Sequence, residues 1–254
     1  MWKVIRSSEL GTSHIESNQP CQDSCFAGVF QGNDAQDYLV CVVSDGAGSA
    51  SQGGYGAELA CEVITKSVEA ALNQISLNSF NESQAQEWIR HVQEAISQTA
   101  SSQALNSRDY ACTLLGAVIG LTHAIFFQIG DGAIVVSNGR IQGVVFWPDS
   151  GPYANMTYFV TDKEALEHLH VSVTTTPIDE VAIFSDGLQR LALSFENRTP
   201  HIPFFEPMLK ILRKRLPDEC EELDHQLSRF LQSPQVNERT DDDKTLILAT
   251  RRTQ

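Results

Sequence analysis

Three apolar runs of this sequence end in the same way, on an aspartate followed at once by a glycine. They end on Asp45 in "CVVSDGAGS", on Asp131 in "AIFFQIGDG" and on Asp186 in "VAIFSDG". A strand holds such an aspartate on a rigid scaffold, and the glycine lets the backbone turn sharply beside it. Asp23 in "CQDSC" and the acidic run at 241–243 in "DDDKT" are further candidates of the same kind.

Carboxylates gathered within a few ångströms repel one another, and a divalent cation removes that repulsion. Mg²⁺ and Mn²⁺ prefer oxygen ligands, so a set rich in aspartate and poor in histidine and cysteine suits them. Taken singly, each Asp-Gly step is typical of a turn or a helix N-cap, and an acidic run is typical of a solvated loop. Cys21 and Cys25 are spaced like half of a zinc site, but no second Cys/His pair follows at suitable spacing.

The composition is that of an ordinary globular chain. Its 254 residues are 42% hydrophobic and 20% charged, and the formal net charge is -14. An acidic chain is a poor nucleic-acid binder, because such surfaces are usually basic. We find no secretory start in "MWKVIRSSEL" and no apolar stretch of the roughly 20 residues that span a bilayer. We therefore expect a cytoplasmic protein with reduced cysteines and with neither nucleic acid nor membrane as a partner.

The elements that must position these aspartates follow from the apolar pattern. Residues 37–45 form a nearly continuous apolar run, which is typical of a strand covered on both faces. Residues 53–75 and 83–104 carry apolar side chains at helical spacing, so we expect an antiparallel helix pair on one sheet face. Further helices are predicted over 203–216 and 218–232, with another beginning at 187–194. Further strands are predicted over 2–10, 24–30, 180–186 and 245–250.

Residues 112–147 contain four short strand-like segments. The first two, within 111–130, are interrupted by glycines, Thr122 and His123, and we interpret them as a strand pair. The Asn-Gly pair at 138–139 suits a type I′ hairpin, so an antiparallel meander is predicted. Residues 235–244 are predicted to be a polar loop. The order of strands and helices gives a mixed α+β pattern without an obvious linker, which favours a single domain over residues 1–254.

In this order the motifs resemble those of the metal-dependent protein phosphatases of type 2C, the PPM family. That family has an early Asp motif, a "DG" after an apolar strand, a Thr-containing strand of small residues, then "GDS", "SDG" and a late "DN". The counterparts here run from Gly11 to Leu248: "QDSCF", "VVSDGAGSA", "CTLLGAVIG", "IGDGA", "IFSDGL" and "DDKTLIL". The segment "GTSHIESNQPCQD" resembles a divergent bacterial branch that carries "GTSH…PCQD" near its start.

The resemblance implies an α+β, four-layer α-β-β-α sandwich, with two antiparallel sheets flanked by helices. It also implies two Mn²⁺ or Mg²⁺ ions in a cleft at one end of the sandwich, and a third where an additional site is present. By resemblance, Asp45 bridges both metals and Gly46 offers its carbonyl oxygen to one of them. Asp186 and Asp242 are then ligands of the first metal. Together Asp45, Asp186 and Asp242 form the expected catalytic set.

The remaining acidic positions follow from the same comparison. Asp242 is preferred within the acidic run because the family spacing is Asp, then Asn or a substitute, one residue, then Thr or Ser. Here that spacing fits 242–245, with Asp243 where Asn is common. Asp23 is similar to the acidic residue that family members place at the second or third metal site. Asp131 resembles the aspartate that supports an additional metal in bacterial members.

Two positions depart from the family pattern. Typical members carry an arginine in the first motif that binds the substrate phosphate, and this chain has His14 there. A histidine can donate a hydrogen bond to phosphate, but it lacks the bidentate fork of arginine; alternatively, His14 is an ordinary loop residue. Many members also have a histidine in "DGHGG", where this chain has "DGAGS". Ala47 cannot transfer a proton.

The resemblance implies a protein serine/threonine phosphatase that hydrolyses phosphate monoesters by a water or hydroxide bridging two divalent cations. Its substrate would be a protein carrying phosphoserine or phosphothreonine, and a Ser/Thr kinase would oppose it. The variable region at 148–178 is expected to lie as a flap beside the cleft. Two alternatives stay open: a pseudophosphatase that acts as an interaction module, suggested by His14 and Ala47, and a phosphatase of small-molecule monoesters.

Overall fold

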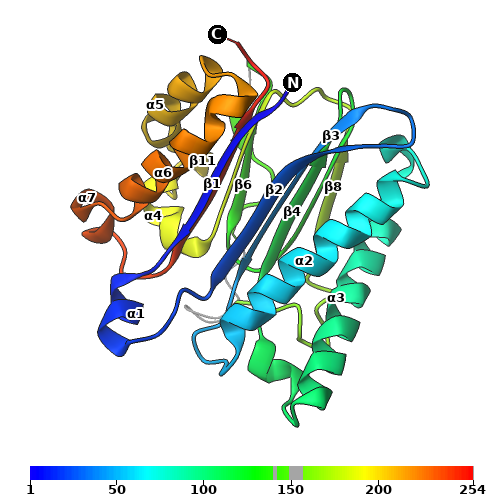
Figure 1. Cartoon of the computed structure of the whole chain (residues 1–254), viewed down its shortest axis with the longest axis vertical. Helices are drawn as coiled ribbons and strands as arrows, with labels where there is room; N and C mark the ends of the chain where they lie inside the picture. Colours follow the sequence, from blue (N-terminus) through cyan, green and yellow to red (C-terminus); the bar gives the residue numbers. More distant parts are fainter. Residues whose placement is uncertain (140–141, 149–156, 254) are drawn as a thin grey trace.

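The computed structural model describes residues 1–139, 142–148 and 157–253. Within them, two five-stranded antiparallel sheets lie face to face (Figure 1). One sheet has, in spatial order, β2 (Asp23–Gln31), β3 (Asp37–Asp45), β4 (Leu114–Ile119), β5 (Ala124–Ile129) and β8 (His170–Thr174). The other has β1 (Lys3–Glu9), β12 (Lys244–Thr250), β9 (Glu180–Phe184), β6 (Ala133–Ser137) and β7 (Gln142–Val144).

Helices cover the outer face of each sheet (Figure 1). The long pair α2 (Gly53–Leu72) and α3 (Glu82–Ser102) lies on the β3 sheet, and α5 (Ile202–Arg213) and α6 (Cys220–Leu231) lie on the β9 sheet. This arrangement confirms the four-layer α-β-β-α sandwich. The smaller elements are α1 (Thr12–Ser17), α4 (Gln189–Ala192), α7 (Pro234–Asn237), the ribbon of β10 (Leu193–Ser194) and β11 (Thr199–Pro200), and 3-10 turns at Leu77–Ser79, Ser107–Tyr110, Asp186–Leu188 and Pro217–Glu219.

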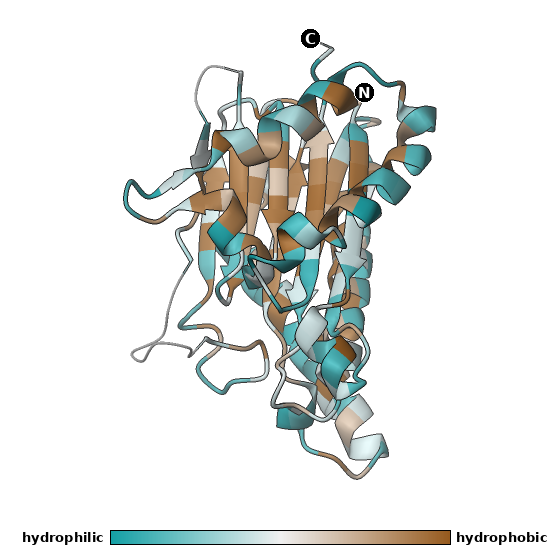
Figure 2. Cartoon of the chain, turned by 90° about the vertical axis from the view of Figure 1, so that its left-hand side faces the viewer, coloured by the Kyte–Doolittle hydropathy of each residue, from teal (hydrophilic) through white to brown (hydrophobic). Residues whose placement is uncertain are grey.

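The strand β3 shows why the two sheets stack. Leu39, Cys41 and Val43 are fully buried and pack against the β9 sheet, while Val40 and Val42 point the other way, towards the α2–α3 layer. This alternation follows from the period of two in a strand, and both faces are apolar because both are covered. The apolar residues form a brown band along the strands in Figure 2, and the helices carry teal on their outer sides.

The helix α3 forms for the reasons that its sequence predicts. Asn81 caps it by accepting a 3.3 Å hydrogen bond from the Gln84 amide, and Glu82 stands in the first turn, where the helix dipole favours a negative charge. Its apolar residues recur at intervals of three and four, so they share one face. Trp88 on that face packs against Phe127 of β5, with ring centroids 5.5 Å apart. The predicted helix pair on one sheet face is confirmed.

The expected meander over residues 112–147 is wrong. The strands β4 and β5 do form the predicted antiparallel pair, but the chain then crosses to the other sheet, where β6 and β7 form a separate hairpin. Gly130 makes the crossing possible, because its φ is 111° and an added Cβ would lie 2.6 Å from the Thr113 side chain. Gly139 has the positive φ, 79°, that the predicted Asn-Gly turn requires, but residues 140–141 of that connection lie outside the described residues.

Other differences concern short elements. The helix expected from 187 is only one turn long, as α4, because the chain turns at once into β10. The polar loop predicted at 235–244 begins inside α7, and the segment around His14 is the short helix α1. Four-residue and six-residue helices are too short to show an amphipathic period. The six cysteines are free thiols, and no helix in the described ranges is long and apolar enough to cross a membrane.

Part of the expected flap at 148–178 can be located. Residues 149–156 lie outside the described residues, whereas 170–174 are β8 and pair with β5. Val160 and Ala165 are buried in the apolar layer beneath α3. The role of this region as a flap, and the division of the chain into a single domain, stay predictions.

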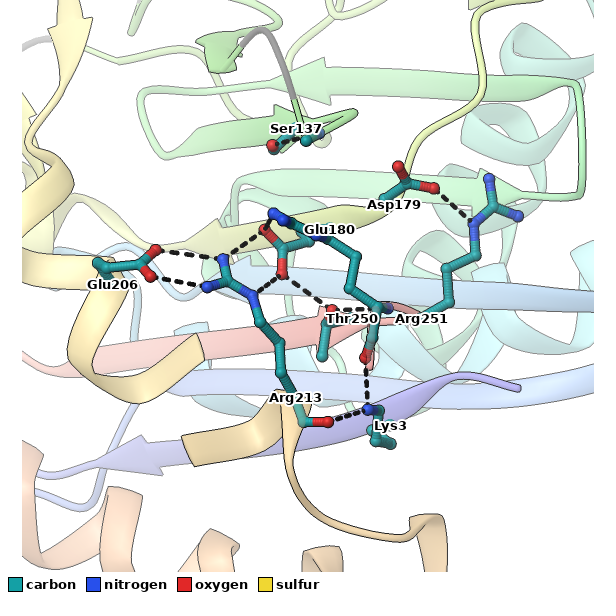
Figure 3. Close-up of polar contacts among 10 residues, drawn as sticks. Lys3, Ser137, Asp179, Glu180, Glu206, Arg213, Thr250 and Arg251 are labelled. Atoms are coloured by element: carbon teal, nitrogen blue, oxygen red, sulfur yellow. Dashed lines mark hydrogen bonds and ion pairs between the residues drawn. The ribbon is translucent and has the colours of Figure 1, made fainter. Parts of the chain in front are cut away.

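A polar network fastens α5 to the end of the β9 sheet that is remote from the Asp-Gly turns (Figure 3). The Arg213 Nε and Nη2 atoms lie 2.7 and 2.8 Å from the two Glu180 carboxylate oxygens, and Glu180 is only 4% exposed. Thr250 donates a 2.9 Å hydrogen bond to the same carboxylate. The Lys3 ammonium donates to the Arg213 and Arg252 carbonyl oxygens at 2.6 and 2.5 Å. This buried carboxylate depends on its partners for compensation of its charge.

We therefore expect Arg213→Met to lower the free energy of unfolding by about 3 kcal/mol, because it leaves Glu180 buried without its bidentate partner. Chemical denaturation measures this change. Lys214→Met, one residue further and exposed, should change stability by less than about 0.5 kcal/mol. Equal losses in the two variants would show that the ion pair is not what fastens α5.

Candidate metal centre

The strand register brings the predicted aspartates to one end of both sheets. In the first sheet, Asp45 at the end of β3 lies opposite Asp23 at the start of β2. In the second sheet, Phe184 at the end of β9 lies opposite both Leu246 of β12 and Ala133 of β6. A cleft of about 940 Å³ opens at this end. Its lining includes the carboxylates Asp45, Asp131, Asp186, Asp241 and Asp242.

Asp45 is fixed by its neighbours in the backbone. Its amide donates a 3.1 Å hydrogen bond to the Thr113 hydroxyl, and its carbonyl accepts a 2.8 Å hydrogen bond from the Thr113 amide. The next residue, Gly46, has no room for a side chain because the first turn of α2 passes close to it. A Cβ added there would lie 2.3 Å from the Gly53 carbonyl carbon. Burial, and then the negative charges of Asp23 and Asp186, hold the pKa of the Asp45 carboxyl well above its usual value.

Asp186 follows β9 in the same way. Gly187 cannot be replaced without a shift, because an added Cβ would lie 2.0 Å from the Asp243 carbonyl oxygen. The Asp186 Oδ1 atom is buried and has no hydrogen-bond partner. Burial, then the charges of Asp131 and Asp242, raises the pKa of Asp186 to about 7. A buried carboxylate with an unused oxygen is poised to accept a cation.

Asp131 and Asp242 complete the set of carboxylates in the cleft that the sequence predicted. Burial raises the pKa of Asp131 above its usual value, with a smaller contribution from the charge of Asp242. Much of Asp242 faces solvent at the cleft mouth, but protein atoms crowd its carboxyl, and this partial burial also raises its pKa. Of the acidic run, Asp241 and Asp242 therefore face the cleft.

Asp243 turns inward, and its contacts are with the backbone and side chains of neighbouring segments. It is 3% exposed, and its carboxylate accepts hydrogen bonds from the Gly11 and Gln22 amides, each at 2.6 Å. It also lies 2.9 Å from His14 Nδ1, so it ties α1 and the start of β2 to the acidic run. His14 lines the cleft, and this hydrogen bond fixes its ring.

Asp23 lies behind this cleft rather than in its lining. Its Oδ2 atom accepts a 2.7 Å hydrogen bond from the Ser185 hydroxyl, whereas its Oδ1 atom is buried without a partner. Burial raises the pKa of Asp23 to about 7, although the hydrogen bonds from Ser185 and Thr245 oppose the rise. It lines a neighbouring hollow of about 720 Å³ beside the first turn of α2.

Several residues of the cleft were not foreseen as site residues. Thr113 lies there and belongs to the predicted Thr-containing strand motif, but no motif pointed to Gln189 or to the three arginines Arg190, Arg198 and Arg239 at the mouth of the cleft. None of the arginines belongs to a motif or a regular spacing. Only the fold reveals them, since they come from separate connections.

The donor chemistry fits hard divalent cations. The described lining offers carboxylate oxygens and no cysteine, and two buried carboxylate oxygens, on Asp23 and Asp186, have no partner. Nevertheless, no three acidic, histidine or cysteine side chains in the described ranges are already grouped as an ion would require.

A sandwich of two antiparallel sheets with an aspartate-lined cleft at their ends is the architecture that the motifs implied. Residues 10–232 match the family described as Protein phosphatase 2C. The chain is 40% identical over 248 residues to Serine/threonine-protein phosphatase 3 of Escherichia coli (strain K12), covering 98% of each chain. The chain therefore belongs to the protein phosphatase 2C family, and its enzymatic class is that of a protein phosphatase. The family resemblance drawn from the ordered motifs is confirmed.

Solved structures agree on the fold. A bacterial serine phosphatase superposes with a TM-score of 0.67 at 16% identity, covering 98% of both chains. Serine/threonine phosphatase Stp1 from Staphylococcus aureus gives 0.62 at 17%, covering 98% of this chain and 95% of that one. The catalytic domain of the phosphatase PstP, solved in complex with two manganese ions, gives 0.64 at 15%, covering 98% and 97%. At such identities these similarities establish the sandwich.

Proposed function

We propose that this protein hydrolyses the phosphate monoesters of phosphoserine and phosphothreonine in proteins, using two divalent cations held by Asp45, Asp186 and Asp242. The observation that supports the proposal best is the gathering of these three carboxylates in one cleft, each with a raised pKa. Such a set is unfavourable by itself and becomes favourable with cations. A Ser/Thr kinase would supply the phosphoprotein substrate.

Each acidic residue has a place in this proposal. Asp45 would bridge the two ions, the Gly46 carbonyl oxygen would bind one of them, and Asp186 and Asp242 would bind the first. Asp131, which also lines the cleft, would support an additional ion. Asp23 would act beside Asp45, its partner in the strand register, where its unpartnered Oδ1 atom is available to an outer ion or its water.

When bound, the cations would polarise the phosphoryl oxygens and lower the pKa of a water nucleophile towards neutrality. The chain itself positions the substrate. His14, its ring held by Asp243, would donate a hydrogen bond from its other nitrogen to the phosphate. Ala47 lines the same cleft and has no proton to give, so no side chain at that position assists the leaving group.

We expect turnover of p-nitrophenyl phosphate and of phosphoserine peptides with Mn²⁺, and loss of that turnover in EDTA. Removing the cations leaves the carboxylates to repel the dianionic phosphate as well as one another. Phosphate release after readdition of Mn²⁺ or Mg²⁺ is the measurement, and recovery serves as the control against irreversible unfolding. Turnover that persists in excess chelator would exclude the proposed mechanism.

The second candidate is a pseudophosphatase that acts as an interaction module, favoured by His14 and Ala47 at the two departing positions. It predicts weak or single-ion binding by calorimetry and no turnover of any phosphopeptide. A panel that adds sugar phosphates and nucleotides separates a small-molecule phosphatase from both. The cytoplasmic location stays a prediction.

A further inference from the structure

Resting on the proposed function, we propose that the three arginines at the cleft mouth form a substrate subsite that selects phosphopeptides with acidic residues beside the phosphorylated one. Arg190, Arg198 and Arg239 all line the cleft. We refer to them as the arginine rim. The chain as a whole has a net charge of -14. Three arginines at one opening are therefore not expected from its composition.

The arginine rim occupies one wall of the cleft. Arg190 comes from α4, Arg198 from the turn between β10 and β11, and Arg239 from the connection that follows α7. All three segments pack on the β9 half of the sandwich. The opposite wall, built by residues 46–48, Thr113 and Phe159, contributes no arginine or lysine among the described lining residues. Asp241 and Asp242 line the cleft near Arg239, so a peptide lying across the cleft would meet the arginine rim on the side where these carboxylates stand.

These guanidinium groups are available to a ligand. Within the described ranges, no ion pair or side-chain hydrogen bond involves Arg190, Arg198 or Arg239. Asp241 lies near Arg239 in sequence and Glu196 near Arg198, yet neither carboxylate pairs with its neighbour. All three arginines are exposed. An unpaired guanidinium is a strong donor for carboxylate, because its planar fork matches the two oxygens.

Arg198 is held in place by aromatic rings. Its Cζ atom lies 5.4 Å from the Trp147 ring centroid, and Trp147 meets Phe195 edge to face at 5.4 Å. Both rings line the cleft, and Phe195 is 50% exposed. The quadrupole of the ring attracts the guanidinium and favours its position over the aromatic face. The exposed ring adds apolar surface for the peptide backbone and its aliphatic groups.

The reacting phosphate does not account for all three arginines. One phosphate monoester is small beside a cleft of about 940 Å³, and the carboxylates with their cations surround it on the proposed mechanism. Arginines from three separate connections would extend beyond it, along the bound peptide. Flanking glutamate or aspartate side chains are the complementary groups.

The test uses three phosphoserine peptides of equal length whose flanking residues are Glu, Gln or Lys, assayed with Mn²⁺ by phosphate release. The parent protein should have a kcat/KM about ten-fold higher for the Glu peptide than for the Gln peptide. This is the combined effect expected of two or three solvent-exposed ion pairs. The preference should come from a lower KM for the Glu peptide. It should decline as the salt concentration rises, because salt screens interactions between exposed charges. The Lys peptide should be the poorest of the three.

Arg198→Gln and Arg239→Gln should each reduce the Glu-to-Gln ratio about two- to three-fold. Arg229→Gln, an exposed arginine of α6 that does not line the cleft, is the matched control and should keep the parent ratio. The double variant R198E/R239E should favour the Lys peptide. Thermal melting establishes that each variant is folded.

Equal kcat/KM values for the Glu and Gln peptides in the parent would overturn the inference and leave the phosphatase activity standing. Arginine variants that lose p-nitrophenyl phosphate turnover as severely as Glu-peptide turnover would also overturn it, since the arginines would then serve the reacting phosphate. Peptide affinity is measured in parallel by fluorescence anisotropy. Tighter binding of the Glu peptide without turnover would support the arginine rim while rejecting the proposed activity.

Discussion

Replacing Asp45 with Asn should lower kcat/KM for a phosphoserine peptide by about 10³-fold. Loss of one electrostatic contact that stabilises the transition state reduces the rate of an enzyme by about this factor. Asp45 stands at the end of β3, opposite Asp23 in the strand register, and its carboxyl interacts with those of Asp23 and Asp186. An amide has one poor oxygen ligand in place of two charged ones. Initial rates at saturating Mn²⁺, together with Mn²⁺ affinity by calorimetry, measure the effect.

Asp37→Asn is the matched control, because it makes the same change at the other end of the same strand, where the side chain is exposed. We expect its kcat/KM to stay within two-fold of the parent, about 0.4 kcal/mol at most. If Asp45→Asn kept more than a tenth of the parent activity at every Mn²⁺ concentration, Asp45 could not be the bridging ligand.

Without metal, the protein should become less stable as the pH rises from about 4 to about 7. The pKa of Asp23 and that of Asp186 are each raised from 3.8 to about 7 in the folded state. Between these values the folded protein binds more protons than the unfolded chain, so the free energy of unfolding falls with rising pH. A rise of this size in the pKa of one carboxyl corresponds to about 4 kcal/mol.

Urea denaturation in EDTA at pH 5, 6, 7 and 8 measures this loss, and the same series in saturating Mn²⁺ should lack it, since the cations compensate the ionised carboxylates. Under metal-free conditions at pH 8, Asp45→Asn should unfold at higher urea than the parent, because a neutral amide replaces a buried charge. Constant stability from pH 5 to 8 in EDTA would contradict the electrostatic account of this cluster.

The long elements could be predicted because their patterns are local. The run at 37–45, the capped helix that begins after Asn81 and the buried segment at 180–184 each carry a period that only one regular structure satisfies. Where one sequence pattern is compatible with two strand arrangements, as over residues 112–147, the prediction was wrong. A meander within one sheet and two hairpins in two sheets have the same alternation, and only packing separates them.

By itself, the sequence determined which aspartates stand at strand ends, and the ordered motifs determined the family. The tertiary structure alone decided which of these carboxylates share a cleft: Asp242 faces it, Asp243 turns away to fasten α1, and Asp23 lines the neighbouring hollow. It also brought Arg190, Arg198 and Arg239 to a single wall. The physical reason is that a side chain's direction depends on strand register and on how two sheets stack, and contacts between distant segments set both.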